Sequence, residues 1–406
     1  MRILYERCCG LDIHKKSVVA CLLTPEGKEV RTFGTMTRDL LGLSDWLAQQ
    51  GCTHVAMEAT GVFWKPVYNL LEDSGMTLLV VNATHIKAVP GRQTDVRDAE
   101  WIADLLQHGL LKPSFIPDRG QRELQELIRY RRSLIGERAR EVNRIQKVLE
   151  GANIKLGSVI SNTMGVSGRA MLEALVAGTT DSKELAKLAT ARLEATPEQL
   201  EAALEGRMGA HQQMLLALQL QHVTQLDEAI DRVSAEIEER LRPFENHLVR
   251  LDTIPGVSRR GAEEIIAAIG VDMSRFPTHR HLASWAKLCP GTNESAGKRG
   301  SATTGKGNPY LRETLVEAGW AAGRTKHTYL AAQFHRLKAR RGAKRAVVAV
   351  GHSILIIAYH ILKEDGTVYQ DLGPNYFDER SKEETTRRTV KRLERLGYKV
   401  TLEPAA

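Results

Sequence analysis

The chain has 406 residues, 42% hydrophobic and 26% charged, a composition typical of globular proteins with two or three domains. The formal net charge of +8 favours an anionic partner, most often nucleic acid. Five cysteines without zinc-like spacing argue against a zinc site, and we expect reduced thiols in a cytoplasmic protein. The N-terminus has no long apolar signal core. We interpret the most apolar stretch, residues 346–362, as a buried helix too short to span a membrane.

The first 110 residues alternate between strand and helix patterns. We expect strands at residues 7–12, 17–23, 29–33, 54–58 and 76–81, and helices at 37–50, 64–73 and 95–107. A hairpin meander followed by alternating helices and strands predicts a mixed sheet flanked by helices. We assign this α/β domain to residues 1–115.

The rest of the chain reads as all-α. Residues 121–150 form a long arginine-rich helical stretch, 151–168 are looser, and 170–241 fit an amphipathic helical hairpin or coiled coil. We assign this arm to residues 116–245 and expect it to serve in dimerisation or as a spacer. A further helical domain, 246–365, and a charged tail, 366–406, complete the chain.

The helical domain begins with a turn at residues 254–257 that leads into a helix. It continues with a glycine-rich flexible loop at 290–309 and helices at 310–324 and 343–362. In the tail we expect a charged helix at 381–396 and a strand at 398–402. The turn resembles a helix-hairpin-helix, whose helix N-terminus can hold a phosphate, although an ordinary glycine turn fits as well.

Four carboxylates stand out in the first domain. Asp12 and Glu58 end predicted strands, and Asp95 and Asp98 lie three apart at a helix start, which places both on one helix face. Oxygen ligands suit Mg²⁺ or Mn²⁺, and two such ions can stabilise the entering and leaving oxygens of a phosphodiester displacement. For any single acid, a helix cap or a turn is an equally good explanation. The ordered set of four favours a metal site.

A second group of polar residues lies in the glycine-rich loop. Ser295 has a hydroxyl that can attack a phosphodiester, and Lys298, Arg299 and Lys306 could stabilise the developing charge. A serine in such a loop is most often simply solvated. By pattern alone, Ser301 and Thr303 are equally eligible.

Basic residues form two further groups. No Asp or Glu occurs between Glu317 and Glu364, which indicates contact with a polyanion. The predicted nucleic-acid contacts in this window are Arg324, Lys326, Arg336, Arg340, Arg341, Lys344 and Arg345. Lys338 and Lys363 are the other basic residues of the same window. The arginines of the 121–150 helix, including Arg131 and Arg144, form the second group, but acids are interleaved there and intrahelical ion pairs compete as an explanation.

The acidic motifs resemble those of the DEDD family of insertion-sequence transposases. The resemblance rests on Asp12 in GLDIHK, Glu58 in MEATG, and Asp95 and Asp98 in DVRD. It implies a RuvC-like, ribonuclease-H-like first domain in which these four acids bind the metal. His14 belongs to the same motif, and we favour a supporting role for it over direct metal ligation.

The second half resembles the other conserved domain of these transposases, from IPGV through LASWAKLCPGTNESAGKRG to NPYLRETL. The family's nucleophile is a serine directly after a Glu, in the loop that follows an L-x-P segment. Ser295 matches, because it follows Glu294 and lies downstream of Leu288-Cys289-Pro290. Residues 151–200 are longer and more helical than in compact members, so family contacts there should not be transferred.

The resemblance implies site-specific recombination of an insertion element through a phosphoserine intermediate. It also implies guidance by a bridge RNA that pairs with donor and target DNA, and dimers that assemble into a tetramer. Whether the serine and the acids act within one protomer or across protomers stays open, as does inversion instead of transposition. We expect a cytoplasmic protein, associated with the nucleoid when active.

Other functions are compatible with parts of this pattern. A hydrolytic nuclease or junction resolvase would need only the acids, and a DNA invertase belongs to a related lineage. A sugar kinase or actin-like ATPase would need glycine-rich phosphate loops, and we find none convincing in the first domain. A non-catalytic nucleic-acid-binding protein would not need Asp12.

Overall fold

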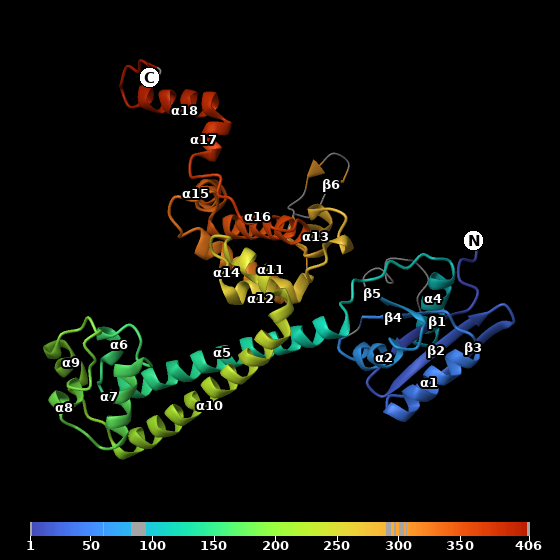
Figure 1. Ribbon diagram of the computed structural model, residues 1–406, viewed down its shortest axis with the longest axis horizontal. Helices are drawn as coiled ribbons and strands as arrows, with labels where there is room; N and C mark the ends of the chain where they lie inside the picture. The colour runs from blue at the N-terminus through green and yellow to red at the C-terminus, as the bar shows by residue number, and fades with distance from the viewer. Residues whose placement is uncertain are drawn as a thin grey trace. The chain divides into compact units, whose positions relative to one another are not determined.

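The chain divides into two compact units. They are an N-terminal unit, Met1–Arg119, and a C-terminal unit, Gly120–Ala406. The computed structural model describes residues 2–59, 61–82, 95–289, 294–295, 298–299, 304–305 and 307–403, and of residues 95–97, 294–295 and 298–299 it describes the backbone alone. The five strands of the N-terminal unit form one mixed sheet (Figure 1).

The strand order of this sheet follows from its connections. The strands are β1 (Cys8–Ile13), β2 (Ser17–Thr24), β3 (Gly27–Gly34), β4 (His54–Glu58) and β5 (Thr77–Val81), in the order β3-β2-β1-β4-β5. The first three pair antiparallel, because short turns join them, whereas β1, β4 and β5 pair parallel. This arrangement confirms the predicted RuvC-like mixed sheet.

Helices cover both faces of the sheet. Helices α1 (Thr37–Gln49) and α2 (Trp64–Leu71) pack on the face that carries Leu11 and Met57. Helix α4 (Asp95–Gln107) packs on the opposite face, against Cys8 and Ala56. All six residues of β1 are buried, as expected for a central strand covered on both sides.

Two long antiparallel helices form an arm in the C-terminal unit (Figure 1). Helix α5 (Arg119–Gly151) and helix α10 (Ala210–Leu241) meet through Leu134, Leu226 and Ile230. At the far end they pack on four short helices: α6 (Leu156–Val159), α7 (Val166–Val176), α8 (Ser182–Ala186) and α9 (Pro197–Leu204). The stretch 170–241 is helical, as predicted, and its long helix α10 pairs with α5 in the arm. The predicted alternative of a hairpin within 170–241 is wrong, because the residues before α10 form a small helical cluster.

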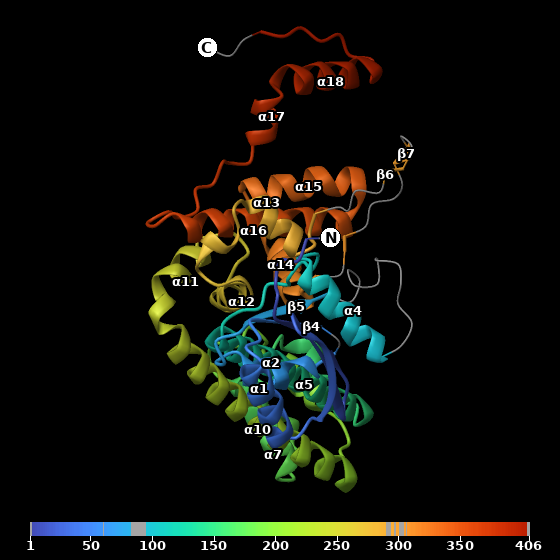
Figure 2. The same cartoon turned by 90° about the vertical axis from the view of Figure 1, so that its right-hand side faces the viewer.

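The remaining helices form a body around one core, with its tail. They are η1 (Arg242–Phe244), α11 (Glu245–Asp252), α12 (Arg259–Ile269), η2 (Met273–Arg275), α13 (His279–Trp285), α14 (Pro309–Ala322), α15 (Tyr329–Arg341), α16 (Ala343–Lys363), α17 (Tyr376–Arg380) and α18 (Lys382–Arg395). A small hairpin, β6 (Glu294–Ser295) and β7 (Lys298–Arg299), lies between α13 and α14 in the chain (Figure 2). The sequence did not predict α15, and residues 398–402 form no strand.

Helix α16 is the centre of this body. Gly319 of α14 and Gly351 of α16 let the two helices approach closely, because a Cβ on either would lie 2.8 Å from a carbonyl oxygen of the other helix. With 21 residues, α16 is long and apolar enough to span a membrane. The prediction that this stretch is too short for a membrane span is therefore wrong. Within the protein, 56% of its apolar window is buried. The helix packs in the core, as the sequence predicted.

Candidate active site and nucleic-acid interface

Two of the predicted acids end neighbouring parallel strands. Leu11 of β1 pairs with Met57 of β4, so the next residues along, Asp12 and Glu58, stand side by side at the same edge of the sheet. Each residue is only 9% exposed. Carboxylates held at that depth need a compensating partner, because desolvation penalises their charge.

Both acids point to the face that α4 covers. A Cβ on Gly10 would lie 2.3 Å from the carbonyl oxygen of Ala99 in α4, so Gly10 faces this helix. Side chains two apart on a strand lie on the same face, so Asp12 faces the α4 side as well. Ala56 of β4 packs against the same helix, which places Glu58 on this face as well.

The direction of α4 brings its first turns to these acids. The helix ends near the start of the sheet, where the backbone of Leu4 donates a hydrogen bond to the carbonyl oxygen of Gln107, 2.8 Å away. Its start therefore lies toward the end of β1. Asp98 directly precedes Ala99 and is 8% exposed. We call Asp12, Glu58 and Asp98 the acidic edge, and Asp95 begins the same helix, although its side chain lies outside the described residues.

His14 supports the acidic edge from the strand end. Its Nε2 lies 3.0 Å from Oδ2 of Asp12, a hydrogen bond between residues two apart on one face of the chain. A ring that orients a carboxylate in this way fits the supporting role predicted for His14.

The chemistry of the edge suits a hard divalent cation. Carboxylate oxygens are the ligands that Mg²⁺ and Mn²⁺ prefer. Among the side chains that the structure describes, no three His, Cys, Asp or Glu residues form a group that could hold a metal ion, so Asp12, Glu58 and Asp98 do not make a metal-binding group by themselves. The side chain of the fourth predicted acid, Asp95, falls outside the described part. The neighbouring cysteines are free thiols, and burial raises the pKa of Cys21 to about 11, so it stays protonated at neutral pH.

Ser295 lies in the small hairpin of the C-terminal unit. In this hairpin Ser295 pairs with Lys298 and Glu294 pairs with Arg299, which sets two basic residues across from the serine strand (Figure 2). The side chains of these four residues lie outside the described part, as do Lys306, Ser301 and Thr303 altogether. The acids and Ser295 thus belong to different units of the chain.

Comparison with protein families identifies the family in which this pattern of acids and serine occurs. Residues 9–154 match the DEDD transposase model of the IS110 family, and residues 249–336 match the model described as transposase IS116/IS110/IS902 family. The chain belongs to the IS110 family of DEDD transposases. The first match covers the acidic edge and the second covers Ser295, in the order that the motifs predicted. No curated protein matches the chain significantly.

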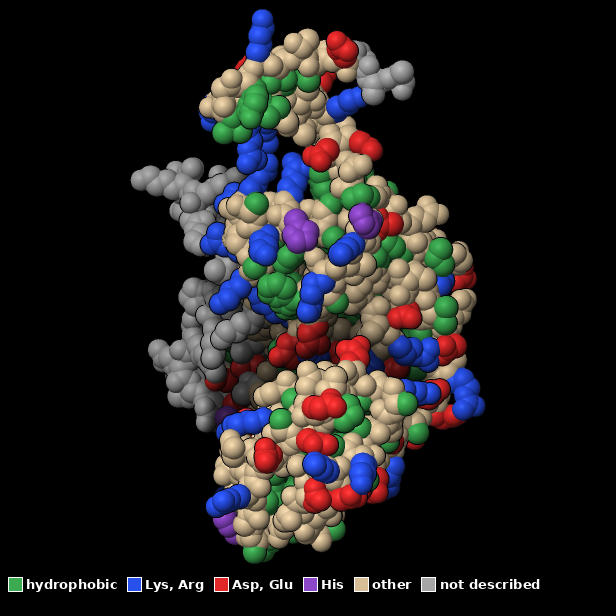
Figure 3. Space-filling view, turned by 90° about the vertical axis from the view of Figure 1, so that its left-hand side faces the viewer, with side chains coloured by type: hydrophobic (Ala, Val, Ile, Leu, Met, Phe, Trp, Pro, Cys, Tyr) green, Lys and Arg blue, Asp and Glu red, His purple; other side chains and the backbone are tan. Residues whose placement is uncertain are grey.

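The transposase carries an uncompensated basic surface on its C-terminal body. Arg324, Lys326, Lys338, Arg340, Arg341, Lys344 and Arg345 are exposed, and among the residues described none of these seven pairs with a carboxylate. Arg336 is half-buried, with its guanidinium 5.1 Å from the ring centre of Phe377. Lys and Arg side chains gather over this body in Figure 3. Such a surface suits the phosphates of nucleic acid.

Arg131 does not belong to the nucleic-acid interface, contrary to the prediction. It is 3% exposed, and its Nη2 lies 2.7 Å from Oε2 of the buried Glu263 in α12. This arginine joins α5 to the C-terminal body and cannot reach a phosphate. Arg144 has a side chain that is 62% exposed and bonds to Glu141, three residues earlier, so its charge is already shared within the arm.

Proposed function

We propose that this transposase cuts and rejoins DNA at an insertion-sequence end, with Ser295 as nucleophile and Mg²⁺ or Mn²⁺ bound by Asp12, Glu58, Asp95 and Asp98. The observation that carries the proposal is the acidic edge. Two buried carboxylates, Asp12 and Glu58, stand side by side at the carboxyl ends of the parallel strands β1 and β4, and the first turn of α4, which covers the same face of the sheet, supplies a third buried carboxylate, Asp98. A protein that served only to bind nucleic acid would gain nothing from collecting negative charge there.

When bound, the metal would stabilise charge on the phosphodiester oxygens. Asp12 would be held for ligation by His14, and Glu58 by its place on the central parallel strand. Asp98 and Asp95 would complete the set from the first turn of α4, where two acids also suit the positive end of the helix dipole.

The covalent step conserves the bond energy of the DNA backbone. The Oγ of Ser295 forms a bond to phosphorus as the bond from phosphorus to one deoxyribose oxygen breaks, and the proton of the serine passes to that leaving oxygen. Attack of a new deoxyribose hydroxyl on the phosphoserine reverses these changes and releases the serine. Lys298 and Arg299 would offset the negative charge that grows on the phosphate.

The basic surface of the C-terminal body supports DNA as a partner. We further propose a guide RNA from the element, dimers joined through the arm, a tetramer for the paired DNA ends, and a cytoplasmic location. The family resemblance suggests these finer points, and each is open to direct measurement of RNA binding and of mass in solution.

The decisive test is a covalent adduct. Purified protein, Mg²⁺, guide RNA and end-labelled donor DNA should give a labelled band that survives denaturation and is absent from Ser295→Ala. Ser301→Ala, a matched serine in the same loop, should retain the band. If Ser295→Ala still cuts the DNA as fast as the native chain, the protein is a hydrolytic nuclease and the serine mechanism is wrong.

A further inference from the structure

The stretch that carries Ser295 leaves the C-terminal body at a fixed point. After α13 ends, the amide of Leu288 donates to the carbonyl oxygen of Ala283, 3.2 Å away, and the thiol of Cys289 lies 3.5 Å from the same oxygen. Lys287 has a φ of +53°, a left-handed conformation that breaks the helical path just after α13. We call residues 290–303 the serine segment.

The chain returns onto the same place. A Cβ on Gly307 would lie 2.4 Å from the carbonyl oxygen of Ala286 and 3.0 Å from the Cβ of Lys287, and one on Gly305 would lie 3.2 Å from the Lys287 side chain. The returning backbone therefore rests directly on the outgoing turn, at a distance that only glycine allows at Gly307. The described residues that flank the serine segment on its two sides are thereby held together.

Arg312 of α14 binds the returning chain. We call the contact of the outgoing residues 286–289 with the returning residues 304–307 the base of the serine segment. Its guanidinium donates to the hydroxyl of Thr304, and its Nη1 lies 3.4 Å from the carbonyl oxygen of Gly305. Both acceptors belong to the returning chain. A planar guanidinium can hold two neighbouring acceptors in one orientation, which a single-point donor cannot do.

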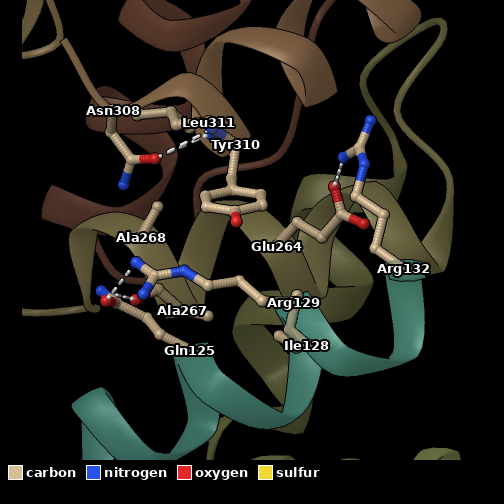
Figure 4. A pocket seen from close by; sticks show the side chains of 10 residues that line it. All are labelled: Gln125, Ile128, Arg129, Arg132, Glu264, Ala267, Ala268, Asn308, Tyr310 and Leu311. Atoms are coloured by element: carbon tan, nitrogen blue, oxygen red, sulfur yellow. Dashed lines mark hydrogen bonds and ion pairs between the residues drawn. The ribbon is translucent and has the colours of Figure 1, made fainter. Parts of the chain in front are cut away.

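The start of α14, which carries Arg312, is held in place by contacts of its own. Asn308 caps the helix, with its Oδ1 3.0 Å from the amide of Tyr310 and 3.3 Å from that of Leu311. The guanidinium of Arg129 in α5 lies 4.9 Å from the centre of the Tyr310 ring. Figure 4 shows the ring and this guanidinium facing each other between α5 and α14.

We propose that Arg312, together with the contact between Gly307 and Ala286, positions the serine segment for attack. The inference rests on the proposed role of Ser295. Arg312 is a positioning residue, since it acts on the ends of the segment and not on DNA. A nucleophile displaced by about 1 Å can lose on the order of 100-fold in rate, so a loosened base should slow the chemistry more than it weakens binding.

Two variants loosen the base from opposite sides. Arg312→Ala removes the hydrogen bonds to Thr304 and Gly305, and Gly307→Ala forces the returning chain away from Ala286. We expect each to slow adduct formation by roughly 10- to 100-fold at saturating DNA while the dissociation constant for DNA changes by less than about twofold. Trypsin should cut the folded protein faster after Lys298 and Arg299. Arg312→Lys should restore part of the rate.

Gly136→Ala in α5 is the matched control, because its new Cβ would meet nothing nearer than 3.6 Å and should change neither readout. Weaker DNA binding in Arg312→Ala, with an unchanged rate at saturation and unchanged proteolysis, would make Arg312 a phosphate contact and overturn the proposal. So would native behaviour of both variants. Proteolysis needs no catalysis, so it still tests the base if Ser295→Ala shows the serine mechanism to be wrong.

Discussion

At the scale of single residues, the buried ion pair between Arg131 and Glu263 makes a direct prediction. Their side chains are 4% and 9% exposed, so removing Arg131 takes the near, buried partner from Glu263 and leaves it with the more exposed Arg259, whose Nε lies 3.4 Å from its Oε1. Arg131→Ala should therefore lower the free energy of unfolding by about 3–5 kcal/mol, measured by urea denaturation. DNA affinity per folded molecule should stay unchanged.

Arg242→Ala is the corresponding surface change. Its side chain is 74% exposed and pairs with Glu239 on the surface, so the loss should stay below about 1 kcal/mol. A native unfolding midpoint for Arg131→Ala, combined with weaker DNA binding, would return Arg131 to the nucleic-acid interface and contradict its structural role.

Residue roles were predictable where the signal was local. Asp12 and Glu58 follow short apolar runs, and such runs are enough to place them at or next to the ends of buried strands. The role of Arg131 was not predictable, because its partner is 132 residues away and the arginine shares its helix with many exposed ones. Arg312 was missed for a similar reason: the acceptors that define it are in a loop whose path the pattern does not reveal.

At the scale of elements, the packing of α4 on β1 decides whether the acids meet. Gly10→Ala would place a Cβ 2.3 Å from one backbone atom of α4 and 2.4 Å from another, so the helix must shift. We expect the free energy of unfolding of the N-terminal unit to fall by about 2 kcal/mol. Binding of Mn²⁺, measured by titration calorimetry, should weaken with it because Asp98 moves away from Asp12.

Gly42→Ala gives the matched comparison in the same unit. Gly42 lies inside α1 with no atom within 4 Å of the added Cβ, so alanine should stabilise the helix by roughly 0.5–1 kcal/mol and leave Mn²⁺ binding alone. Tight Mn²⁺ binding by Gly10→Ala would mean that the position of α4 does not control the acidic edge.

Elements were predictable where the pattern of apolar residues was strong. The strand at His54–Glu58 and the helix at Asp95–Gln107 have the bounds that the sequence predicted. The hairpin predicted within residues 170–241 was wrong because short amphipathic helices have the same spacing of Leu and Ala as one long helix. Only the tertiary contacts of the cluster around Met171, Leu185 and Leu200 divide it.

At the scale of the whole molecule, the two units have separate hydrophobic cores. The sheet packs its hydrophobic residues with α1, α2 and α4, and the arm and the C-terminal body bury theirs among the helices that follow. Sequence could assign this division, because a strand-rich region gives way to a helical one. No pattern in the sequence says how the acidic edge and Ser295 would meet on DNA, as the proposed function requires.

The separate cores lead us to expect that the N-terminal unit unfolds in a transition of its own in scanning calorimetry. Because the proposed ligands all lie in that unit, Mg²⁺ or Mn²⁺ should raise this transition and leave the other unchanged. A metal concentration 100 times its dissociation constant adds about 2.7 kcal/mol to the stability of the folded state. In Asp98→Asn the metal-dependent rise should disappear, while the transition of the C-terminal unit stays where it was. A rise that persists in Asp98→Asn, or that appears in the C-terminal transition instead, would place the metal somewhere other than the acidic edge.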